Sequence, residues 1–457
     1  LKNATEVSDF FATYLQPGGF NNDSTVYIGL DSYWDNISYS DLIKFVKDCK
    51  TKNQNAGIYW TPFVDWAKNP ERIVEGSNGI YYKDIYLYAN GKPQEIAGAY
   101  AIDPTHPATK RRADVYLNRF ITQGFTYLKL DFLSHGALES DHYYDTTVFT
   151  GIQAYNQGMK YITDYLNGKM YINLSISPLF PSQYGNSRRI ACDAYASIND
   201  TEYTLNSLTY GWWLDHVYTF NDADNVVLNG VSTGENRARV TSSIITGIFI
   251  SGDDFSSSGT STAKTRAMTF LTNREVNYIA RMTKAFYPVE TGSGNSASEI
   301  FMQTLADTIY IALFNYSNSS VTKEINFERI GLKKGNTYTV HELWSNVKYE
   351  KTDSWQENIP RKDVKLFKIY PGPILSNYDI LETNNITLYP NPCTDHLYLI
   401  NYNGNDVFSV YSYLGTRVKV FNGNNNGIYV GDLAKGLYFL VKESKERKYL
   451  ISNFIKN

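Results

Sequence analysis

The sequence predicts an α/β fold for its first 290 residues, a (β/α)₈ TIM barrel, followed by two smaller all-β segments. Short apolar runs alternate with longer amphipathic stretches in the first 290 residues, which is typical of parallel β/α units. Polar and acidic residues recur where the apolar runs end, as expected when the C-terminal face of a barrel carries the site. Beyond this region the pattern changes to strand-like alternation.

Seven strands are predicted in the barrel segment, at 26–31, 57–62, 127–132, 170–177, 189–193, 217–220 and 248–251. Apolar residues at helical spacing predict helices over 40–50 and 152–166. The segment 5–15 also has the pattern of a helix rather than a strand. We therefore expect the first of the eight barrel strands to precede residue 1, with the chain truncated at its N-terminus.

Two linker-like stretches divide the chain into three predicted domains. A Gly- and Ser-rich stretch covers 288–298, and a second stretch with Pro, Gly and Asn covers 371–385. The predicted domains are the barrel at 1–290, an antiparallel β-sandwich at 298–371, and an Ig-like all-β domain at 386–457.

Composition excludes several classes of protein. The chain has 43 basic and 46 acidic residues, so a net charge of −3 gives no basic surface for nucleic acid. No apolar run is long enough to span a membrane. The three cysteines provide neither a disulfide framework nor a zinc-binding spacing. Aromatic residues reach 15%, with 39 Tyr, which fits either sugar stacking or abundant β-structure.

Two strand-end carboxylates are the main catalytic candidates. Asp131 and Asp193 end the fourth and sixth expected strands, counting the missing first one. Glycoside hydrolysis with retention requires two carboxyl groups about 5–5.5 Å apart, one attacking the anomeric carbon and the other acting as acid and base. This chemistry needs neither metal nor cofactor.

A basic residue accompanies each of these acids. Lys129 lies two residues before Asp131, so alternation places both on the inward side of the strand. Arg189 lies four residues before Asp193, which along a strand is again the same face. A cation beside the nucleophile favours its ionised form. The alternative is a pair of purely structural ion pairs inside the barrel.

At these residues the sequence resembles melibiase-type α-galactosidases, glycoside hydrolase families 27 and 36. YLKLDFLSHGA at 127–137 is similar to their nucleophile strand, and RRIACDAY at 188–195 to the strand of their acid/base. AIDPTHPATK, FTGIQAYNQGMKYI, ISPLFPS, FNDADN and SGDD match further segments in order over roughly residues 20–290. The segment 299–371 resembles the β-domain that follows the barrel in these enzymes.

The resemblance implies roles for individual residues. Asp131 corresponds to the nucleophile and Asp193 to the acid/base, while Lys129 and Arg189 correspond to residues that bond sugar hydroxyls. Ser175 falls where relatives often have Cys. An aromatic residue of the sugar subsite corresponds to one of two neighbours, Tyr59 or Trp60.

One departure from the family pattern concerns the choice of sugar. Asp31 falls where the family has an acidic pair that reads galactose hydroxyls, but the preceding residue is Leu30. Losing a hydrogen-bonding group of this kind can change the preferred sugar. Asp222 and Asp224 are left with two interpretations, lining the pocket or capping the following helix.

The final segment resembles the C-terminal sorting domain of the type IX secretion system. The resemblance rests on LYPNPCTDHLYL at 388–399, VYSYLGTRV at 410–418, GIYVGDLAKGLYFLVK at 427–442 and a basic end. It implies a Bacteroidetes-type origin, export by that machinery, and a secreted or surface-attached protein at the outer-membrane exterior. The alternative is a carbohydrate-binding module, which would expose aromatic residues on one face, whereas alternation within the strands predicts that these aromatic residues are mostly core.

The sequence therefore predicts a retaining exo-glycosidase that hydrolyses terminal α-galactosides through a covalent glycosyl-enzyme. A second hypothesis keeps the mechanism but changes the sugar to a β-L-arabinopyranoside, an α-N-acetylgalactosaminide or an α-glucan. A third is a surface glycan-binding protein without activity. The expected partners are a carbohydrate and the secretion machinery, with no nucleic acid and no membrane span.

Overall fold

One parallel sheet organises the first part of the chain. The computed structural model describes residues 1–22, 25–290, 296–306, 308–372, 386–400, 406–413, 415–422, 427–443 and 448–457. Seven strands pair in parallel in the order β1-β2-β8-β9-β10-β11-β12, with β1 and β12 at the edges. They are β1 (Val26–Leu30), β2 (Gln54–Trp60), β8 (Tyr127–Leu130), β9 (Tyr171–Leu174), β10 (Ser187–Arg189), β11 (Phe220–Val226) and β12 (Ile248–Ser251).

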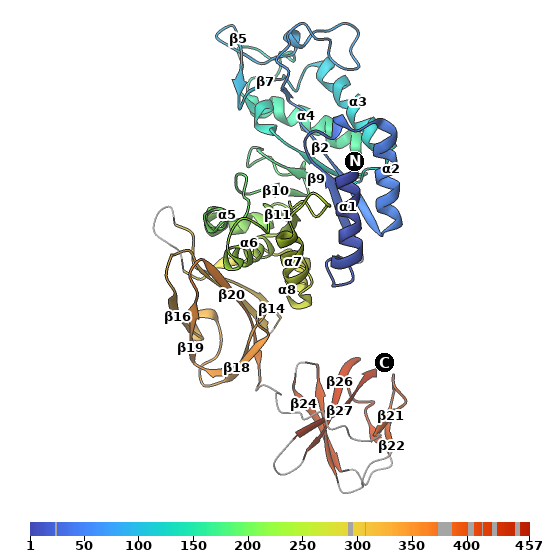
Figure 1. Cartoon of the computed structure of the whole chain (residues 1–457), viewed down its shortest axis with the longest axis vertical. Helices are drawn as coiled ribbons and strands as arrows, with labels where there is room; N and C mark the ends of the chain where they lie inside the picture. The colour runs from blue at the N-terminus through green and yellow to red at the C-terminus, as the bar shows by residue number, and fades with distance from the viewer. Residues whose placement is uncertain are drawn as a thin grey trace. The chain divides into compact units, whose positions relative to one another are not determined.

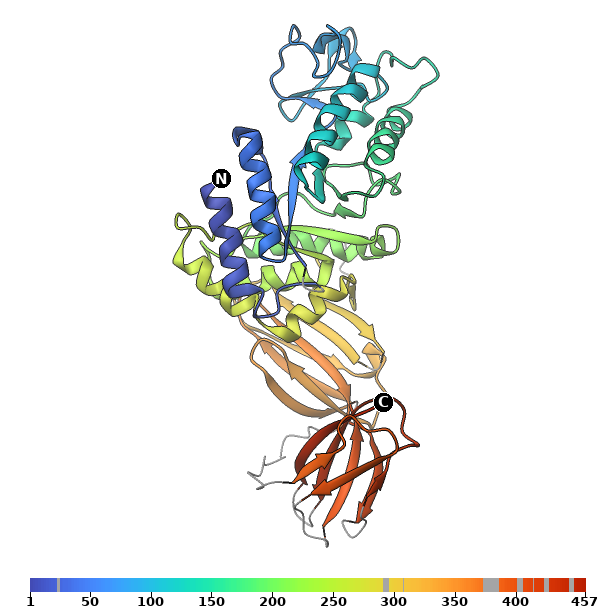
Figure 2. The same ribbon diagram turned by 90° about the vertical axis from the view of Figure 1, so that its right-hand side faces the viewer.

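Eight α-helices accompany this sheet, and the strands curl so that the assembly is a barrel open between β12 and β1 in the described chain (Figures 1 and 2). They are α1 (Lys2–Phe10), α2 (Tyr39–Thr51), α3 (Pro107–Gln123), α4 (Gly151–Leu166), α5 (Ile198–Gly211), α6 (Thr233–Thr246), α7 (Ser261–Phe270) and α8 (Arg274–Met282). A π-helical turn, Phe11–Leu15, continues α1. The described residues before β1 contain no strand, and the expectation of a further strand before residue 1 stays a prediction.

The helices begin and end where local chemistry dictates. Thr150, Ser197 and Ser232 each cap a helix with a side-chain oxygen, and the third residue of each helix bonds back to complete a capping box. Helix α3 ends at Gly124, whose φ of 90° suits glycine. On α4, Tyr155, Met159, Ile162 and Leu166 are buried against the sheet, although Ile152 in the first turn is exposed. The 3.6-residue period thus predicts most of the buried face.

A small subdomain is inserted between β2 and α3. Its short strands are β3 (Val64–Asp65), β4 (Tyr88–Ala89), β5 (Lys92–Pro93), β6 (Glu95–Ile96) and β7 (Ala99–Ala101). Its core is built from Val74, Tyr82, Ile85, Tyr86 and Ile102. The loop that follows β2 therefore carries substantial structure next to the C-terminal ends of the strands (Figure 1).

All seven predicted strands exist, but two are misplaced along the chain. The strand predicted at 189–193 is β10 and ends at Arg189, so Asp193 lies in the loop beyond it. The strand predicted at 217–220 is β11 and starts only at Phe220, because a 3-10 turn, Trp212–His216, precedes it. The Ile190 N–H still bonds the backbone of β11, but the Ala194 N–H bonds the side chain of Asp224, which the apolar pattern does not reveal.

The segment after the barrel folds as antiparallel β-structure. One sheet has the order β13-β14-β15-β20-β17-β18, and β16 pairs with β19. The strands are β13 (Tyr287–Pro288), β14 (Ile300–Leu305), β15 (Thr308–Asn315), β16 (Val321–Asn326), β17 (Thr337–Glu342), β18 (Val347–Thr352), β19 (Ser354–Ile359) and β20 (Asp363–Pro371). Phe327, Trp355 and Phe367 contact one another in the core. The predicted all-β character of this segment is confirmed.

The C-terminal part consists of two further antiparallel sheets, β21-β22-β25 and β24-β23-β26-β27. Their strands are β21 (Thr387–Tyr389), β22 (His396–Ile400), β23 (Val407–Ser412), β24 (Arg417–Asn422), β25 (Ile428–Tyr429), β26 (Gly436–Glu443) and β27 (Lys448–Lys456). Phe408, Leu440 and Phe454 lie in its core. Tyr389, Tyr398 and Tyr429 are exposed, so the expectation that its aromatic residues are core holds only in part.

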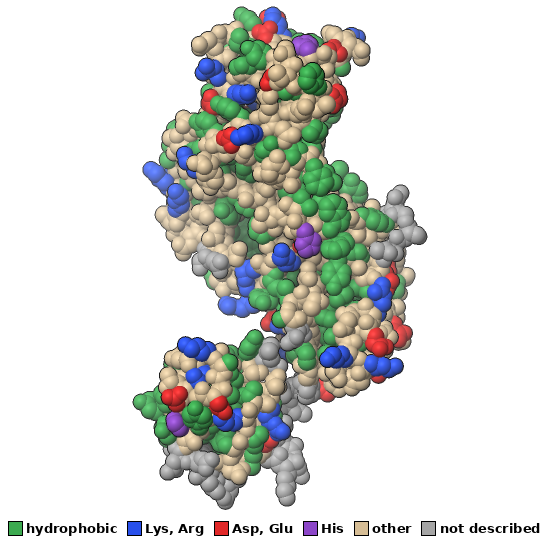
Figure 3. Space-filling model, turned by 180° about the vertical axis from the view of Figure 1, so that it is seen from behind, with side chains coloured by type: hydrophobic (Ala, Val, Ile, Leu, Met, Phe, Trp, Pro, Cys, Tyr) green, Lys and Arg blue, Asp and Glu red, His purple; other side chains and the backbone are tan. Residues whose placement is uncertain are grey.

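The surface view agrees with the balanced composition. On the face drawn in Figure 3, basic and acidic side chains are scattered rather than gathered into a patch of one sign. None of the helices in the described ranges has the length and hydropathy needed to cross a membrane.

Candidate functional site at the strand ends

Asp131 is the residue that directly follows β8. Its side chain points to the C-terminal end of the sheet and is largely buried, with the residue 8% exposed. Its Oδ1 accepts a hydrogen bond from the backbone N–H of Phe132 at 2.7 Å. Burial raises the pKa of Asp131, although the positive charges of Lys129 and Arg189 and the Phe132 N–H oppose that rise. The result is a partly desolvated carboxyl group of the kind used as a nucleophile.

Lys129 connects Asp131 with the end of β1. Its Nζ lies 2.8 Å from Asp31 Oδ2 and 3.9 Å from Asp131 Oδ2. Partial burial would raise the pKa of Asp31, but Lys129 and Ser32 outweigh it and lower that pKa. The two residues that alternation placed on the inner face of the strand therefore do lie together.

Tyr59 belongs to the same cluster because β2 and β8 pair with Tyr59 opposite Lys129. The Lys129 ammonium lies 5.1 Å from the centre of the Tyr59 ring, a cation–π distance. Burial, and then the negative charge of Asp131, raise the pKa of the Tyr59 hydroxyl well above its usual value. Tyr59 thus presents a neutral hydroxyl and a ring edge beside Asp131.

Ser175 follows β9, next to Asp131 across the sheet. Its N–H donates to the carbonyl of Leu130 at 2.8 Å. The residue is 1% exposed, and its hydroxyl has no hydrogen-bond partner within the described part of the chain. Ser175 therefore lies next to the cluster, and its buried hydroxyl is left without a hydrogen bond from the described residues.

Arg189 is the last residue of β10 and the centre of the second half of the site. Its Nη1 donates to Asp193 Oδ1 at 2.9 Å, and its Nη2 lies 2.5 Å from Asp224 Oδ1. Its Nε lies 3.9 Å from Asp222 Oδ2. These three carboxylates raise the pKa of Arg189 in spite of its burial, so the guanidinium is permanently charged.

Asp193 differs from Asp131 in its surroundings. It lies four residues beyond the end of β10, and its side chain is 73% exposed. The predicted contact with Arg189 is present, but the predicted reason is wrong, since the two residues do not share a strand. The exposed carboxyl group is accessible to substrate and water, as an acid/base must be.

Asp222 and Asp224 do not cap the following helix; both are buried beside Arg189, and their lining of a sugar pocket stays a prediction. Asp224 Oδ2 accepts from the N–H of Ala194 at 2.7 Å, and Asp222 Oδ2 accepts from Asn173 Nδ2 at 2.7 Å. Helix α6 is capped by Ser232 instead. The sequence feature that could have predicted these contacts is Arg189 on the neighbouring strand, because a buried guanidinium requires carboxylate partners.

Arg189 links the two halves of the cluster. It donates to Asp193, and it is close enough to Asp131 for each charge to shift the pKa of the other group. Arg189 therefore bonds the exposed carboxyl group directly and acts on the buried one through its charge. This arrangement can supply one group to attack and a second to transfer a proton.

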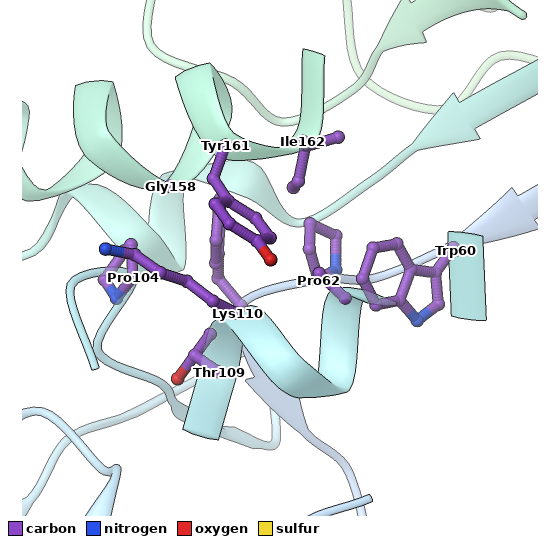
Figure 4. A pocket seen from close by; sticks show the side chains of 10 residues that line it. Trp60, Pro62, Pro104, Thr109, Lys110, Gly158, Tyr161 and Ile162 are labelled. Carbon is purple, nitrogen blue, oxygen red and sulfur yellow. The ribbon is translucent and has the colours of Figure 1, made fainter. Parts of the chain in front are cut away.

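Trp60 is not part of this cluster. Alternation along β2 turns it to the opposite side from Tyr59, where it stacks on Tyr116 of α3 at 5.2 Å and contacts Arg112. It lines a pocket about the size of one water molecule, between α3 and α4, together with Pro62 and Tyr161 (Figure 4). Of the two aromatic residues, Trp60 is therefore packed away from the cluster, and Tyr59 is the one that lies beside Lys129.

The histidines near the strand ends have structural roles. His106 caps α3 by accepting the Ala108 N–H at 3.0 Å, and His135 bonds the carbonyl groups of Phe132 and Ile96. Cys192, the residue before Asp193, is exposed. Within the described ranges no group of His, Cys, Asp and Glu has the arrangement of a metal site.

Comparison with protein families identifies the two C-terminal segments. Residues 295–369 match the alpha galactosidase C-terminal beta sandwich domain, and residues 387–457 match the secretion system C-terminal sorting domain. The resemblance of both segments is thereby confirmed. The sorting domain indicates that the protein is secreted. A comparison with curated protein sequences finds no match.

Solved structures share the fold of the barrel and the segment after it. A family 27 β-L-arabinopyranosidase from Geobacillus stearothermophilus has a TM-score of 0.63 and 15% identity, covering 81% of this chain and 93% of its own. Alpha-galactosidase I from Mortierella vinacea has a TM-score of 0.53 and 17% identity, covering 80% and 91%.

The isomalto-dextranase of Arthrobacter globiformis T6, complexed with panose, is similar over the whole chain. It has a TM-score of 0.55 and 15% identity, covering 100% of this chain and 91% of its own. At such identities the likeness concerns the fold, and these relatives act on different sugars. The predicted (β/α)₈ class with a following β-sandwich is confirmed.

Proposed function

We propose that this chain is a retaining glycoside hydrolase that removes terminal α-galactosyl groups from a carbohydrate, with Asp131 as nucleophile and Asp193 as acid/base. The observation that carries the proposal is that two acids follow neighbouring parts of the same sheet, each with a cation beside it: Lys129 lies 3.9 Å from the buried Asp131, and Arg189 bonds the exposed Asp193 at 2.9 Å. The similarity in fold to glycosidases supports the same class of reaction.

The reaction proceeds in two displacements. In the first, a carboxylate oxygen of Asp131 forms a bond to the anomeric carbon while the bond to the leaving oxygen breaks and Asp193 gives that oxygen its proton. In the second, water attacks the same carbon, Asp193 accepts a proton from the water, and the ester to Asp131 breaks. Two inversions give net retention at the anomeric carbon.

The other residues of the cluster bind the sugar in this proposal. Asp31 and Lys129 form a charged pair that can bond sugar hydroxyls, and the ring of Tyr59 lies beside them. Ser175 has a hydroxyl with no partner among the described residues, next to Asp131. We assign these residues to the subsite of the terminal sugar, together with Arg189.

A change of sugar is the second candidate, because Leu30 replaces an acidic residue of the family pattern. Asp31 therefore provides the only carboxylate at that point of the chain, and it is already paired with Lys129. The relatives of the same fold include a β-L-arabinopyranosidase and an isomalto-dextranase. A β-L-arabinopyranoside, an α-N-acetylgalactosaminide and an α-glucan are the alternatives.

The sorting domain extends the proposal to location and partners. We infer that the type IX secretion machinery exports the chain through residues 387–457 and leaves it at the outer-membrane exterior. There the enzyme would meet extracellular carbohydrate. The domain limits 1–290, 298–371 and 386–457 are proposed on the same basis.

The test uses the whole chain and a panel of aryl glycosides. We expect turnover of the α-galactoside to exceed that of the α-N-acetylgalactosaminide, the β-L-arabinopyranoside and the α-glucoside, with proton NMR showing the α-anomer as the first product. A preference for another glycoside would change the sugar and keep the mechanism. Release of the β-anomer from the α-galactoside would contradict retention, and glycan binding without turnover would indicate a non-catalytic binding protein.

A further inference from the structure

Arg239 is a fully buried cation that the proposed mechanism does not use. It lies on α6 (Thr233–Thr246) and has no exposed surface. Burial lowers the pKa of Arg239 to about 10, against the opposing effect of nearby carboxylates that include Asp224, so the group keeps its charge at neutral pH. A buried charge of this kind is costly unless its contacts are well arranged.

The contacts of Arg239 surround one residue of β11. Its Nη2 donates to the carbonyl oxygens of Ala223 and Asn225, each at 2.7 Å, and its Nη1 donates to Ser242 Oγ at 2.9 Å. The two carbonyl groups stand on either side of Asp224. Arg239 therefore binds the backbone carbonyl groups immediately before and after Asp224.

Asp224 has a backbone conformation that needs such support. Its φ is +67°, a left-handed value that is uncommon for residues other than glycine. The pairing of β11 with β12 shifts register between Asp222 and Asn225, which marks a bulge at this point. Bulges of this kind redirect a side chain, and here the redirected side chain is the Asp224 carboxylate.

The Asp224 carboxylate in turn holds both attachments of Asp193. Its Oδ2 accepts from the N–H of Ala194, the residue after Asp193, at 2.7 Å. Its Oδ1 lies 2.5 Å from Nη2 of Arg189, whose Nη1 donates to Asp193 at 2.9 Å. The exposed side chain of Asp193 is thus fixed through its backbone neighbour and through Arg189, and Asp224 is common to both.

We propose that Arg239 is a positioning residue for the acid/base Asp193, acting through the bulge at Asp224. The proposal rests on the proposed function, since it assumes that Asp193 transfers a proton to the leaving group. Arg239 touches neither substrate nor Asp193. It keeps the Asp224 carboxylate in contact with Ala194 and Arg189. These two contacts hold the loop after β10 and so fix the position of the Asp193 carboxyl group.

A purely structural role and a positioning role differ in how activity depends on the leaving group. A proton donor matters most when the departing oxygen is strongly basic, and little when it leaves readily as a nitrophenolate. Misplacing Asp193 should therefore slow the hydrolysis of an alkyl galactoside far more than that of a dinitrophenyl galactoside. A general loss of folded enzyme slows both in the same proportion.

The experiment compares kcat/KM on these two substrates for Arg239→Lys, Arg239→Gln and Asp224→Asn. Each variant should lose at least roughly tenfold more on the alkyl galactoside than on the dinitrophenyl galactoside. Asp224→Asn can still accept the Ala194 N–H but no longer provides a charge for Arg189, so it tests the connection even if Arg239→Gln fails to fold.

Arg237→Gln is the matched control. Arg237 lies on the same helix and forms a bidentate ion pair with Asp363, so its loss also removes a buried charge contact. We expect Arg237→Gln to affect the two substrates equally.

Two results would overturn the proposal, and they are distinguishable. If Asp193→Asn depends strongly on the leaving group while the Arg239 and Asp224 variants lose activity equally on both substrates, Arg239 is structural only and the proposed function stands. If Asp193→Asn itself shows no dependence on the leaving group, or if the unmodified chain hydrolyses no glycoside of the aryl panel, the assignment of the acid/base fails and the positioning role fails with it.

Discussion

Asp131 and Asp193 lie in contrasting environments beyond the ends of two strands of the same sheet. Asp131 directly follows β8, is 8% exposed, and has a backbone N–H and Lys129 as close partners. Asp193 lies four residues beyond β10, is 73% exposed in its side chain, and is held through Arg189 and the loop around Ala194. The strand register places the first carboxyl group, whereas a chain of ion pairs places the second.

The contrast has a chemical reason. A nucleophile must sit at a fixed distance from one carbon atom, and a strand end is a rigid support for it. An acid/base must reach a leaving group, then a water molecule, and therefore benefits from exposure. The following predictions test whether the two halves behave in these different ways.

Replacing Asp131, the buried carboxyl group, should have the largest effect on activity. Asp131→Asn removes the group that forms the covalent bond, so turnover of an aryl α-galactoside should fall by several orders of magnitude whatever the leaving group. The measurement is kcat/KM on nitrophenyl and alkyl galactosides. Asp164→Asn, which removes an exposed, ion-paired carboxylate of α4, is the control and should behave like the unmodified chain. Substantial activity in Asp131→Asn would refute the nucleophile.

Replacing the exposed member should have a smaller and more selective effect. Asp193→Asn should lower kcat/KM on an alkyl galactoside by about 10²–10⁴-fold, because general acid catalysis is lost. On a dinitrophenyl galactoside the first step should be nearly unaffected, and a covalent intermediate should accumulate because no base activates water. Equal losses on both substrates would remove the distinction between the two carboxylates.

The cation beside Asp131 should control the pH dependence of activity. Lys129→Met removes a positive charge 3.9 Å from the carboxyl group, which disfavours its ionised form and raises the pKa of Asp131 further. The acidic limb of kcat/KM should move to higher pH by about 1–3 units. Lys44→Met, which breaks an exposed ion pair on α2, is the control. A shift to lower pH would contradict the described surroundings of Asp131.

Neighbouring aromatic residues should separate activity from stability. Trp60→Ala should lower the free energy of unfolding by about 3–5 kcal/mol, because Trp60 packs against α3, while kcat/KM of the folded protein changes little. Tyr59→Phe should reduce kcat/KM with a stability change of about 1 kcal/mol or less. Urea unfolding measures the stability of each variant, and kinetics on the same preparations measure its activity. The opposite pattern would place Trp60, rather than Tyr59, in the site.

The smallest predicted effect concerns stability. The pKa of Asp131 is raised in the folded protein, so its contribution is favourable below the unfolded pKa and is lost as pH rises through the folded pKa. Asp131→Asn should therefore stabilise the fold by about 1 kcal/mol at pH 7. The gain should shrink as the pH is lowered, because the carboxyl group is then protonated in a growing fraction of the folded protein. Destabilisation at pH 7 would mean that the carboxylate is better solvated than its burial indicates.

The sequence predicts those features of the fold and the site that local periodicity determines. Apolar runs indicate all seven strands of the parallel sheet, although β10 and β11 lie at shifted positions, and alternation along β8 brings Lys129 to the side of Asp131. Alternation along β2 also shows that Tyr59 and Trp60 point to opposite faces. Which of them faces the site follows only when the pairing of Tyr59 with Lys129 is known. That register depends on pairing between strands, which no single segment contains.

The parts that the sequence does not predict depend on side chains that meet from distant segments. Asp193 leaves the strand because Asp224, 30 residues beyond Ala194, accepts a hydrogen bond from the Ala194 N–H. Arg239 reaches back to the carbonyl groups beside Asp224 from a helix that otherwise resembles any buried helix. Long polar side chains can extend in many directions, so their partners become known only from the fold.

The central claim, that Asp131 carries the sugar during catalysis, can be tested by trapping the intermediate. Incubation with a 2-deoxy-2-fluoro-α-galactosyl fluoride slows the second displacement, and mass spectrometry of the digested protein then locates the label. We predict one fluorogalactosyl adduct on the peptide that contains Asp131, and none in Asp131→Asn. A label on another residue, or steady turnover with no covalent adduct, would contradict this account.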